Sequence, residues 1–160
     1  MNNKILKLMQ DNARIDISDI ATITGLTEEE VAQRIKGMEK EGVIRGYKTI
    51  VDRRLTGEDS VSAVIELKVV PKADRGFEEV AGRIALYPEV ESVSLMSGAC
   101  DLSVVVTCKS FNEVSNFVAK ELATIDSVTA TATQFIMRRY KDHGVVLTDE
   151  EKDRRDKVSL

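Results

Sequence analysis

The stretch VAQRIKGMEKEGVIRGY, residues 31–47, joins an amphipathic helix pattern to a glycine stop and an extended continuation. Val31, Ile35 and Met38 recur at intervals of four and three residues, which places them on one face of a helix. Gly42 ends the pattern, because a residue without Cβ readily adopts the left-handed conformation that closes a helix. The residues after it lack helical periodicity and are expected to run as extended chain with a glycine kink.

Two shorter helices are expected before this stretch. Residues 3–10 have one apolar face, and residues 17–24 have another that ends at a Thr-Gly pair. Thr27 and Glu30 have the spacing of a capping box, in which each side chain bonds the other residue's backbone N–H, so a third helix begins there. Three helices, a glycine turn and an extended ribbon predict a winged helix-turn-helix domain over residues 1–51.

The third helix of such a domain enters the major groove of DNA, with its apolar face turned inward. Lysine and arginine neutralise phosphates, and glutamine and arginine form paired hydrogen bonds with base edges. The predicted DNA-binding residues are Thr27, Gln33, Arg34, Lys36, Gly37, Lys40, Arg45 and Lys48. Residues 1–50, however, contain eight Lys/Arg and eight Asp/Glu, and Glu28–Glu30 would repel phosphate. Charge alone therefore leaves a three-helix unit that binds protein, or nothing, as an open alternative.

A resemblance to a known family favours the DNA-binding interpretation of this domain. The pattern Val31-x-x-Arg34-Ile35-x-x-Met38-Glu39-x-x-Gly42-Val43-Ile44-x-Gly46-Tyr47 resembles the recognition helix and wing of the Lrp/AsnC (feast/famine) transcription regulators. The resemblance implies a sequence-specific regulator that binds double-stranded DNA and responds to a small-molecule effector, an amino acid.

A second domain is expected beyond a polar linker, residues 52–60, in which Leu55 should pack against a domain. Period-two alternation predicts strands, and period-3.6 patterns predict helices. The predicted strands cover residues 61–70, 90–96, 100–108 and 128–137, and the predicted helices cover residues 77–87, where Pro88 ends the helix, and 111–122. This βαββαβ order predicts an α+β, ferredoxin-like (ACT-like) domain for ligand binding and oligomerisation over residues 61–140. Residues 141–160 are expected to form a charged C-terminal tail, in which residues 145–147 could add an edge strand.

Both helices of this domain should cover one face of the sheet and leave the other face open. Counting alternation along each strand assigns to the open face Val64, Val93, Leu95, Val105 and Phe135. An exposed apolar face is an association surface, so a homodimer is expected. A two-fold dimer presents two recognition helices to a near-palindromic DNA site.

The second domain also resembles the effector domain of the Lrp/AsnC family, in which Ser97-Gly98-x-x-Asp101 resembles a loop of an amino-acid pocket between subunits. The effector-binding residues that the resemblance implies are Ser97, Gly98, Ala99, Cys100, Asp101, Thr131 and Thr133. Loop N–H groups can hold a carboxylate, and Asp101 can accept hydrogen bonds from an ammonium group. A plain β-hairpin turn would use the same residues for its own bonds. The resemblance further implies dimers that build tetramers or octamers.

Composition restricts the other classes of function. The net charge is −4, and no apolar run approaches the roughly 20 residues of a membrane span. The N-terminus lacks a signal-peptide core, so a cytoplasmic location without membrane contact is expected. Two cysteines and a single histidine, His143, do not make a structural zinc site, and no metal or cofactor is expected.

No enzymatic activity is expected either, because the chain has no glycine-rich phosphate loop and no nucleophile–base pair. Two alternatives stay open. The first is an oligomeric ligand-binding module that no longer binds DNA. The second is an enzyme resembling the sirohaem decarboxylases, which share the two-domain layout but depend on additional His- and Arg-containing motifs.

Overall fold

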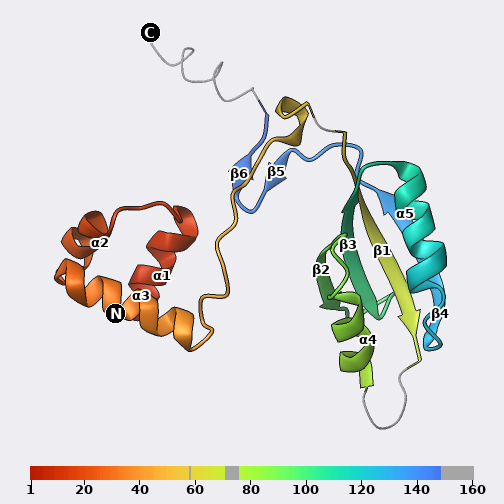
Figure 1. Cartoon of the computed structure of the whole chain (residues 1–160), viewed down its shortest axis with the longest axis horizontal. Helices are drawn as coiled ribbons and strands as arrows, with labels where there is room; N and C mark the ends of the chain where they lie inside the picture. Colours follow the sequence, from red (N-terminus) through yellow and green to blue (C-terminus); the bar gives the residue numbers. More distant parts are fainter. Residues whose placement is uncertain (58, 71–75, 149–160) are drawn as a thin grey trace. The chain divides into compact units, whose positions relative to one another are not determined.

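The computed structural model describes residues 1–57, 59–70 and 76–148, and the chain divides into two compact units, residues 1–50 and 51–160. Each unit has its own cluster of buried hydrophobic side chains. The elements of the first unit are α1 (Asn2–Asp11), α2 (Ile17–Thr24) and α3 (Glu28–Lys40) (Figure 1). The described elements of the second unit are η1 (Arg53–Leu55), β1 (Val61–Val69), α4 (Gly76–Ile84), β2 (Val90–Leu95), β3 (Leu102–Cys108), α5 (Phe111–Phe117), η2 (Val118–Leu122), β4 (Val128–Phe135), β5 (Lys141–Asp142) and β6 (Val145–Val146).

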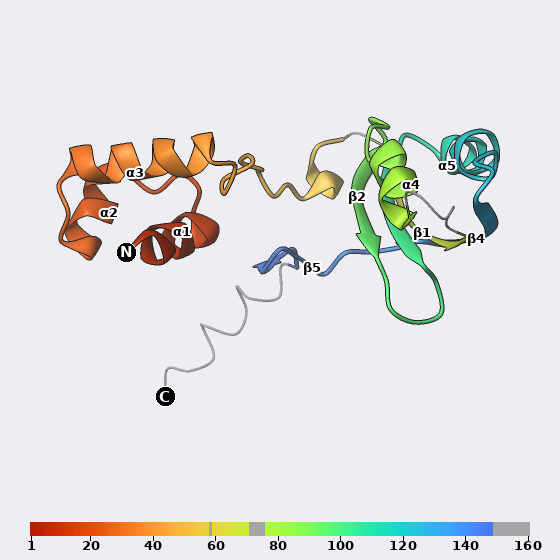
Figure 2. The ribbon, with the colours of Figure 1, turned by 90° about the horizontal axis from the view of Figure 1, so that it is seen from below.

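The first unit confirms the three predicted helices and the turn between the second and third. Its core consists of Ile5, Ile20, Ala21, Val31 and Met38. Figure 2 shows α3 extending across α1 and α2, and α3 packs against both. The glycine after α2 has φ +74°, a left-handed conformation that turns the chain sharply toward α3.

The end of α3 is fixed by a Schellman motif. Gly42 has φ +72°, and its N–H donates to the Glu39 carbonyl at 3.1 Å. The Val43 N–H donates to the Met38 carbonyl at 2.9 Å, so two carbonyls left unpaired at the helix end are satisfied. The chain that follows bends at residues 43–44 and then runs without regular secondary structure, and within the described residues it pairs with no strand, so the predicted extended ribbon does not form a strand.

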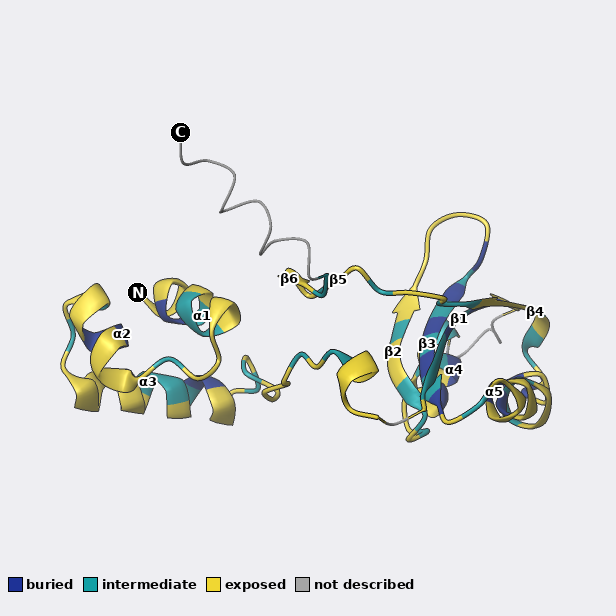
Figure 3. Ribbon diagram, turned by 90° about the horizontal axis from the view of Figure 1, so that it is seen from above, coloured by how far each residue is buried: buried dark blue, intermediate teal, exposed yellow. Residues whose placement is uncertain are grey.

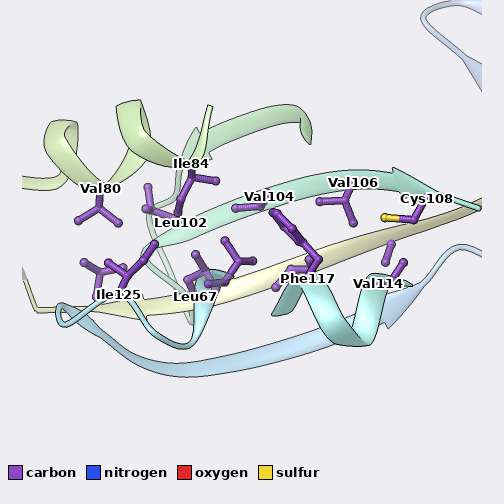
Figure 4. Close-up of a cluster of buried hydrophobic side chains, with 14 residues drawn as sticks. Leu67, Val80, Ile84, Leu102, Val104, Val106, Cys108, Val114, Phe117 and Ile125 are labelled. Carbon is purple, nitrogen blue, oxygen red and sulfur yellow. The ribbon is translucent and has the colours of Figure 1, made fainter. Parts of the chain in front are cut away.

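The second unit is a four-stranded antiparallel sheet in the order β2-β3-β1-β4, which confirms the ferredoxin-like βαββαβ topology. Strands β1 and β3 lie in the centre and bury alternate residues. Figure 4 shows the β3 row meeting side chains of α4 and α5. The labelled members of this core are Leu67, Val80, Ile84, Leu102, Val104, Val106, Cys108, Val114, Phe117 and Ile125. Cys108 and Cys100 are both buried free cysteines.

A register shift in β2 changes which of its side chains face the helices. The shift lies between Val90 and Ser92, so Val90 and Val93 both pack against the core although they have opposite parity in the sequence. Val93 is the partner of Val104, and Leu95 is the partner of Leu102, which are both core residues. The assignment of Val93 and Leu95 to the open face is therefore wrong.

A second irregularity does the same in β4. Val69 is the partner of Val128, but Lys68 is the partner of Ala130, so one residue of β4 is left over. Phe135 consequently faces the core side, opposite Ala63, and its assignment to the open face is also wrong. The open face consists of Ser62, Val64, Glu66, Lys68, Ser92, Ser94, Ser103, Val105, Thr107, Ala130, Ala132 and Gln134. Small and polar residues thus dominate it, with Val64 and Val105 as an adjacent apolar pair.

Polar contacts, and not apolar burial, hold the linker segment η1. Leu55 is 83% exposed, so the expectation that it packs against a domain is wrong. Asp52 accepts hydrogen bonds from the Arg54 backbone N–H at 3.1 Å and from its Nε at 2.9 Å. The Arg54 guanidinium also donates to the Leu147 carbonyl, which joins the linker to the C-terminal segment.

The beginning of that C-terminal segment is ordered into a hairpin. Strands β5 and β6 pair with each other in a separate two-stranded sheet, so residues 145–146 are not an edge strand of the main sheet. The charged remainder of the predicted tail, residues 149–160, lies outside the described residues.

Candidate nucleic-acid interface and effector loop

One face of α3 carries polar side chains that the protein itself does not use. Gln33, Lys36, Gly37 and Lys40 follow one another at helical spacing, on the side opposite the buried Val31 and Met38. We call these four residues the exposed stripe. Its three side chains are exposed, and among the described residues none of them makes a hydrogen bond or ion pair. Figure 3 shows that most of α3 is exposed.

Arg34 lies outside this stripe. Its position on α3 is displaced toward the apolar face, and its Nη1 donates to Asn2 Oδ1 at 3.0 Å, at the start of α1. The side chain is half-buried. The structure therefore separates Arg34 from the other α3 residues that were predicted to contact DNA, and gives it a contact that joins two helices.

Thr27 and Glu30 form the predicted capping box at the start of α3. The Thr27 hydroxyl accepts the Glu30 N–H at 3.2 Å, and the Glu30 carboxylate accepts the Thr27 N–H at 2.9 Å. These bonds favour the ionised carboxylate and lower the pKa of Glu30. One of the three consecutive glutamates is thus committed to the helix cap.

The chain beyond α3 folds back onto the helix. The Tyr47 hydroxyl donates to Glu39 Oε1 at 2.8 Å, and this bond raises the pKa of Tyr47, because losing the proton would leave two anions together. The Arg45 guanidinium lies over Gly42, where an added Cβ would come within 3.2 Å of its Cζ. Lys48 is exposed and makes no hydrogen bond or ion pair with any of the described residues. Tyr47 was missed as a positioning residue, since spacing alone does not reveal a bond across eight residues.

The loop between β2 and β3 is attached to the sheet through Asp101. Its Oδ2 accepts the Val69 N–H at 2.8 Å, and its own N–H donates to the Leu67 carbonyl at 2.9 Å. The Asp101 carboxylate thus bonds β1 and not its own turn, whereas the Asp101 backbone carbonyl closes the loop by accepting the Met96 N–H at 2.8 Å. Asp101 Oδ1 nevertheless has no hydrogen bond within the described part of the chain.

The tip of the same loop has unused hydrogen-bonding groups. Ser97, Gly98 and Ala99 are exposed, and Cys100 is buried. Over the described residues, no hydrogen bond involves the backbone N–H groups of residues 97–100. Four such donors beside a carboxylate oxygen offer partners for both ends of a zwitterion.

Thr131 and Thr133 are not brought together with this loop within one subunit. Thr131, on β4, is the strand partner of Leu67 on β1. Asp101 bonds Leu67 from the opposite edge of β1, the edge that faces β3. Two strand spacings, roughly 10 Å, separate them. A cavity of about 130 Å³ lies elsewhere, between α4 and residues 124–127, and none of the predicted effector residues lines it.

Neither a metal cluster nor a membrane span is found in the part of the chain that the structure describes. No group of three or more His, Cys, Asp or Glu residues there could hold a metal ion. No described helix combines the length and the apolar character that crossing a bilayer requires.

Two domain families match the chain. The winged helix-turn-helix DNA-binding family matches residues 2–45, and the Lrp/AsnC ligand binding domain matches residues 62–146. An HTH-type transcriptional regulator of Bacillus subtilis, YugG, is 44% identical over 98% of this chain and 95% of its own length. The HTH-type transcriptional regulator FL11 of Pyrococcus horikoshii is 32% identical over 89% of this chain and 91% of its own length.

Solved structures share the fold. A Neisseria meningitidis transcriptional regulator, crystallised as a complex with L-Met, superposes with a TM-score of 0.70 at 21% identity, over 94% of this chain and 96% of that one. The leucine response regulatory protein of Mycobacterium tuberculosis superposes with a TM-score of 0.73 at 20% identity, over 89% of this chain and 94% of that one.

Proposed function

The chain belongs to the Lrp/AsnC family of transcription regulators, and we propose that it reads a specific DNA site through the exposed stripe of α3 and senses an amino acid through the 97–101 loop. The observation that carries the DNA part is the stripe itself. Lys36 and Lys40 supply charges for phosphates, and Gln33 supplies the paired donor and acceptor that suit a base edge.

The other predicted DNA-binding residues take supporting roles in this proposal. Lys48 adds a phosphate contact from the extended chain, and Arg45 is close enough to the end of α3 to add another. Arg34 and Thr27 act indirectly, because Arg34 holds α1 and Thr27 caps α3.

We also propose that the chain is a homodimer paired through the open face. The helices leave this face uncovered, and its small side chains allow a second sheet to approach closely around Val64 and Val105. Two-fold pairing would present two copies of α3 to a near-palindromic site, which compensates for the neutral charge of residues 1–50 by doubling the contacts.

The proposal of an amino-acid effector rests on the hydrogen-bonding groups of the 97–101 loop. Free N–H groups at residues 97–100 suit a carboxylate, and Asp101 Oδ1 suits an ammonium group. The L-Met complex of the related Neisseria fold supports an amino acid as the ligand class. Because Thr131 and Thr133 lie across β1 from the loop, we propose that they complete an effector pocket with the loop of another subunit.

The regulator is favoured over the enzyme alternative by the position of the histidine. His143 lies exposed in the turn of the β5–β6 hairpin, 3.1 Å from Asp142, and no predicted site residue is bonded to it. A sirohaem-decarboxylase-like activity would need His- and Arg-containing motifs that this chain does not have.

The test is a titration of the full-length protein against its own upstream DNA and against random DNA, at several salt concentrations. We expect tighter binding to the upstream fragment, with log K falling linearly as log[salt] rises. Lys36→Ala and Lys40→Ala should each weaken binding to all DNA sequences to the same extent and reduce the slope of log K against log[salt] by about 1. Gln33→Ala should instead change which sequence is preferred. Equal affinity for both DNAs, or no binding, would contradict the proposal and favour the ligand-binding module.

A further inference from the structure

Gly37 stands in the interior of α3, where glycine is costly. A helical glycine lowers helix stability relative to alanine because it loses more backbone freedom on folding. The fold offers no steric reason for it, since a Cβ built at Gly37 would meet no atom within 4 Å. Its φ also lies outside the left-handed region that favours glycine. The chain by itself would accept alanine here.

An open helical glycine is not evidence of a site on its own, and Gly82 in α4 has equally open surroundings. The neighbours make the difference. Gly37 lies one helical turn from both Gln33 and Lys40 and next to Lys36, and these three side chains have no partner among the described residues. The missing side chain at Gly37 therefore leaves a gap in the helix surface, and the exposed side chains of Gln33, Lys36 and Lys40 surround this gap.

We infer that Gly37 is the point at which DNA comes closest to α3, so that a base edge in the major groove lies against the bare helix backbone. This inference rests on the proposed function. Without a side chain at 37, the helix can lie deeper in the groove, where Gln33 reaches a base and both lysines reach phosphates. A methyl group at 37 would hold the helix away and lengthen all three contacts together.

The inference predicts that stability and binding change in opposite directions. The full-length protein with Gly37→Ala should melt a few degrees higher than wild type, because alanine favours the helix. Its affinity for a DNA fragment that wild type selects from a random library should fall by about 10-fold or more, the loss typical of one poorly fitted base contact. Gly37→Leu should bind still more weakly, and both variants should show a smaller salt slope although every lysine is retained.

Two variants are matched controls. Gly82→Ala makes the same substitution in α4 and should raise the melting temperature without changing DNA affinity. Ala32→Gly introduces a glycine at an exposed position of α3 outside the stripe, and should lower the melting temperature while DNA affinity is preserved.

The outcomes separate the inference from the proposed function. If wild type selects a sequence and Gly37→Ala binds it equally well with an unchanged salt slope, the inference is wrong and the proposed function stands. If wild type selects no sequence, the proposed function fails and the inference fails with it. If Ala32→Gly weakens binding as much as Gly37→Ala, affinity responds to any substitution on the exposed part of α3 and not to a side chain at position 37 in particular, and the inference is again wrong.

Discussion

Asp101 illustrates how one side chain can serve the fold and remain available for a ligand. One of its carboxylate oxygens satisfies the N–H of Val69, at the point where the pairing of β1 with β4 shifts register. That N–H belongs to a buried residue and would otherwise lack a partner. The second oxygen is unengaged among the described residues, so stability and effector binding need separate tests.

We expect Asp101→Ala to lower the free energy of unfolding by about 1–3 kcal/mol, because it leaves a buried donor unsatisfied. Asp101→Asn keeps an acceptor oxygen and should recover most of that stability, which thermal denaturation would measure. In a thermal-shift screen of amino acids, the asparagine variant should lose the shift that wild type shows, because the charge that holds an ammonium group is gone. An asparagine variant that responds like wild type would remove Asp101 from the effector site.

Arg34 shows what residue spacing leaves undetermined. Helical periodicity places Arg34 beside the apolar face of α3, but its hydrogen-bond partner, Asn2, is 32 positions away in the chain. Only the packing of α1 against α3 brings the two together. Sequence spacing alone therefore does not decide whether Arg34 faces DNA or bonds another helix.

Among the elements, α3 owes its boundaries to local sequence. The capping box at Thr27 and the Schellman motif at Gly42 use bonds between residues at most five positions apart, so the sequence predicts both ends of the helix. Sheet pairing is different, because each register shift in β2 and β4 depends on a strand distant in the chain.

The capping box should make the stability of the first unit depend on pH. The pKa of Glu30 is lowered in the folded state, so its contribution is present above the unfolded pKa near 4.5 and is lost as pH falls through the folded pKa. Glu30→Gln should flatten this dependence in chemical denaturation between about pH 3 and pH 6, roughly one and a half units either side of that pKa. Thr27→Ala should cost about 1 kcal/mol at neutral pH.

Glu28→Gln is the matched control for the cap. Glu28 lies in the same turn and makes no hydrogen bond within the described residues. The Glu28→Gln variant should keep the loss of stability at acid pH that wild type shows. An equal flattening in Glu28→Gln and Glu30→Gln would assign the effect to the helix dipole and not to the capping bonds.

For the whole molecule, association is expected to depend on the open face. Val64→Glu places a carboxylate at the centre of that face, where two copies would meet in a dimer. We expect the dimer dissociation constant to rise by about 10-fold or more, equivalent to about 1.4 kcal/mol, because a charge would be buried without a partner. Sedimentation velocity over a concentration series would measure it.

Ala85→Glu adds the same charge at an exposed residue just beyond α4, on the other side of the sheet, and should leave self-association unchanged. Dissociation by Ala85→Glu but not by Val64→Glu would locate the interface on the helical side and contradict pairing through the open face.

The sequence by itself determined what depends on neighbours along the chain: the three helices, both caps of α3, the βαββαβ order and the family. These follow from periodicity and turn chemistry, which act over a few residues. Tertiary structure alone decided which strand residues face the helices, because a single unpaired residue reverses the parity of all that follow it. It also decided that Arg34 bonds α1, and that β1 separates the loop at Asp101 from Thr131, because both depend on distant segments coming together.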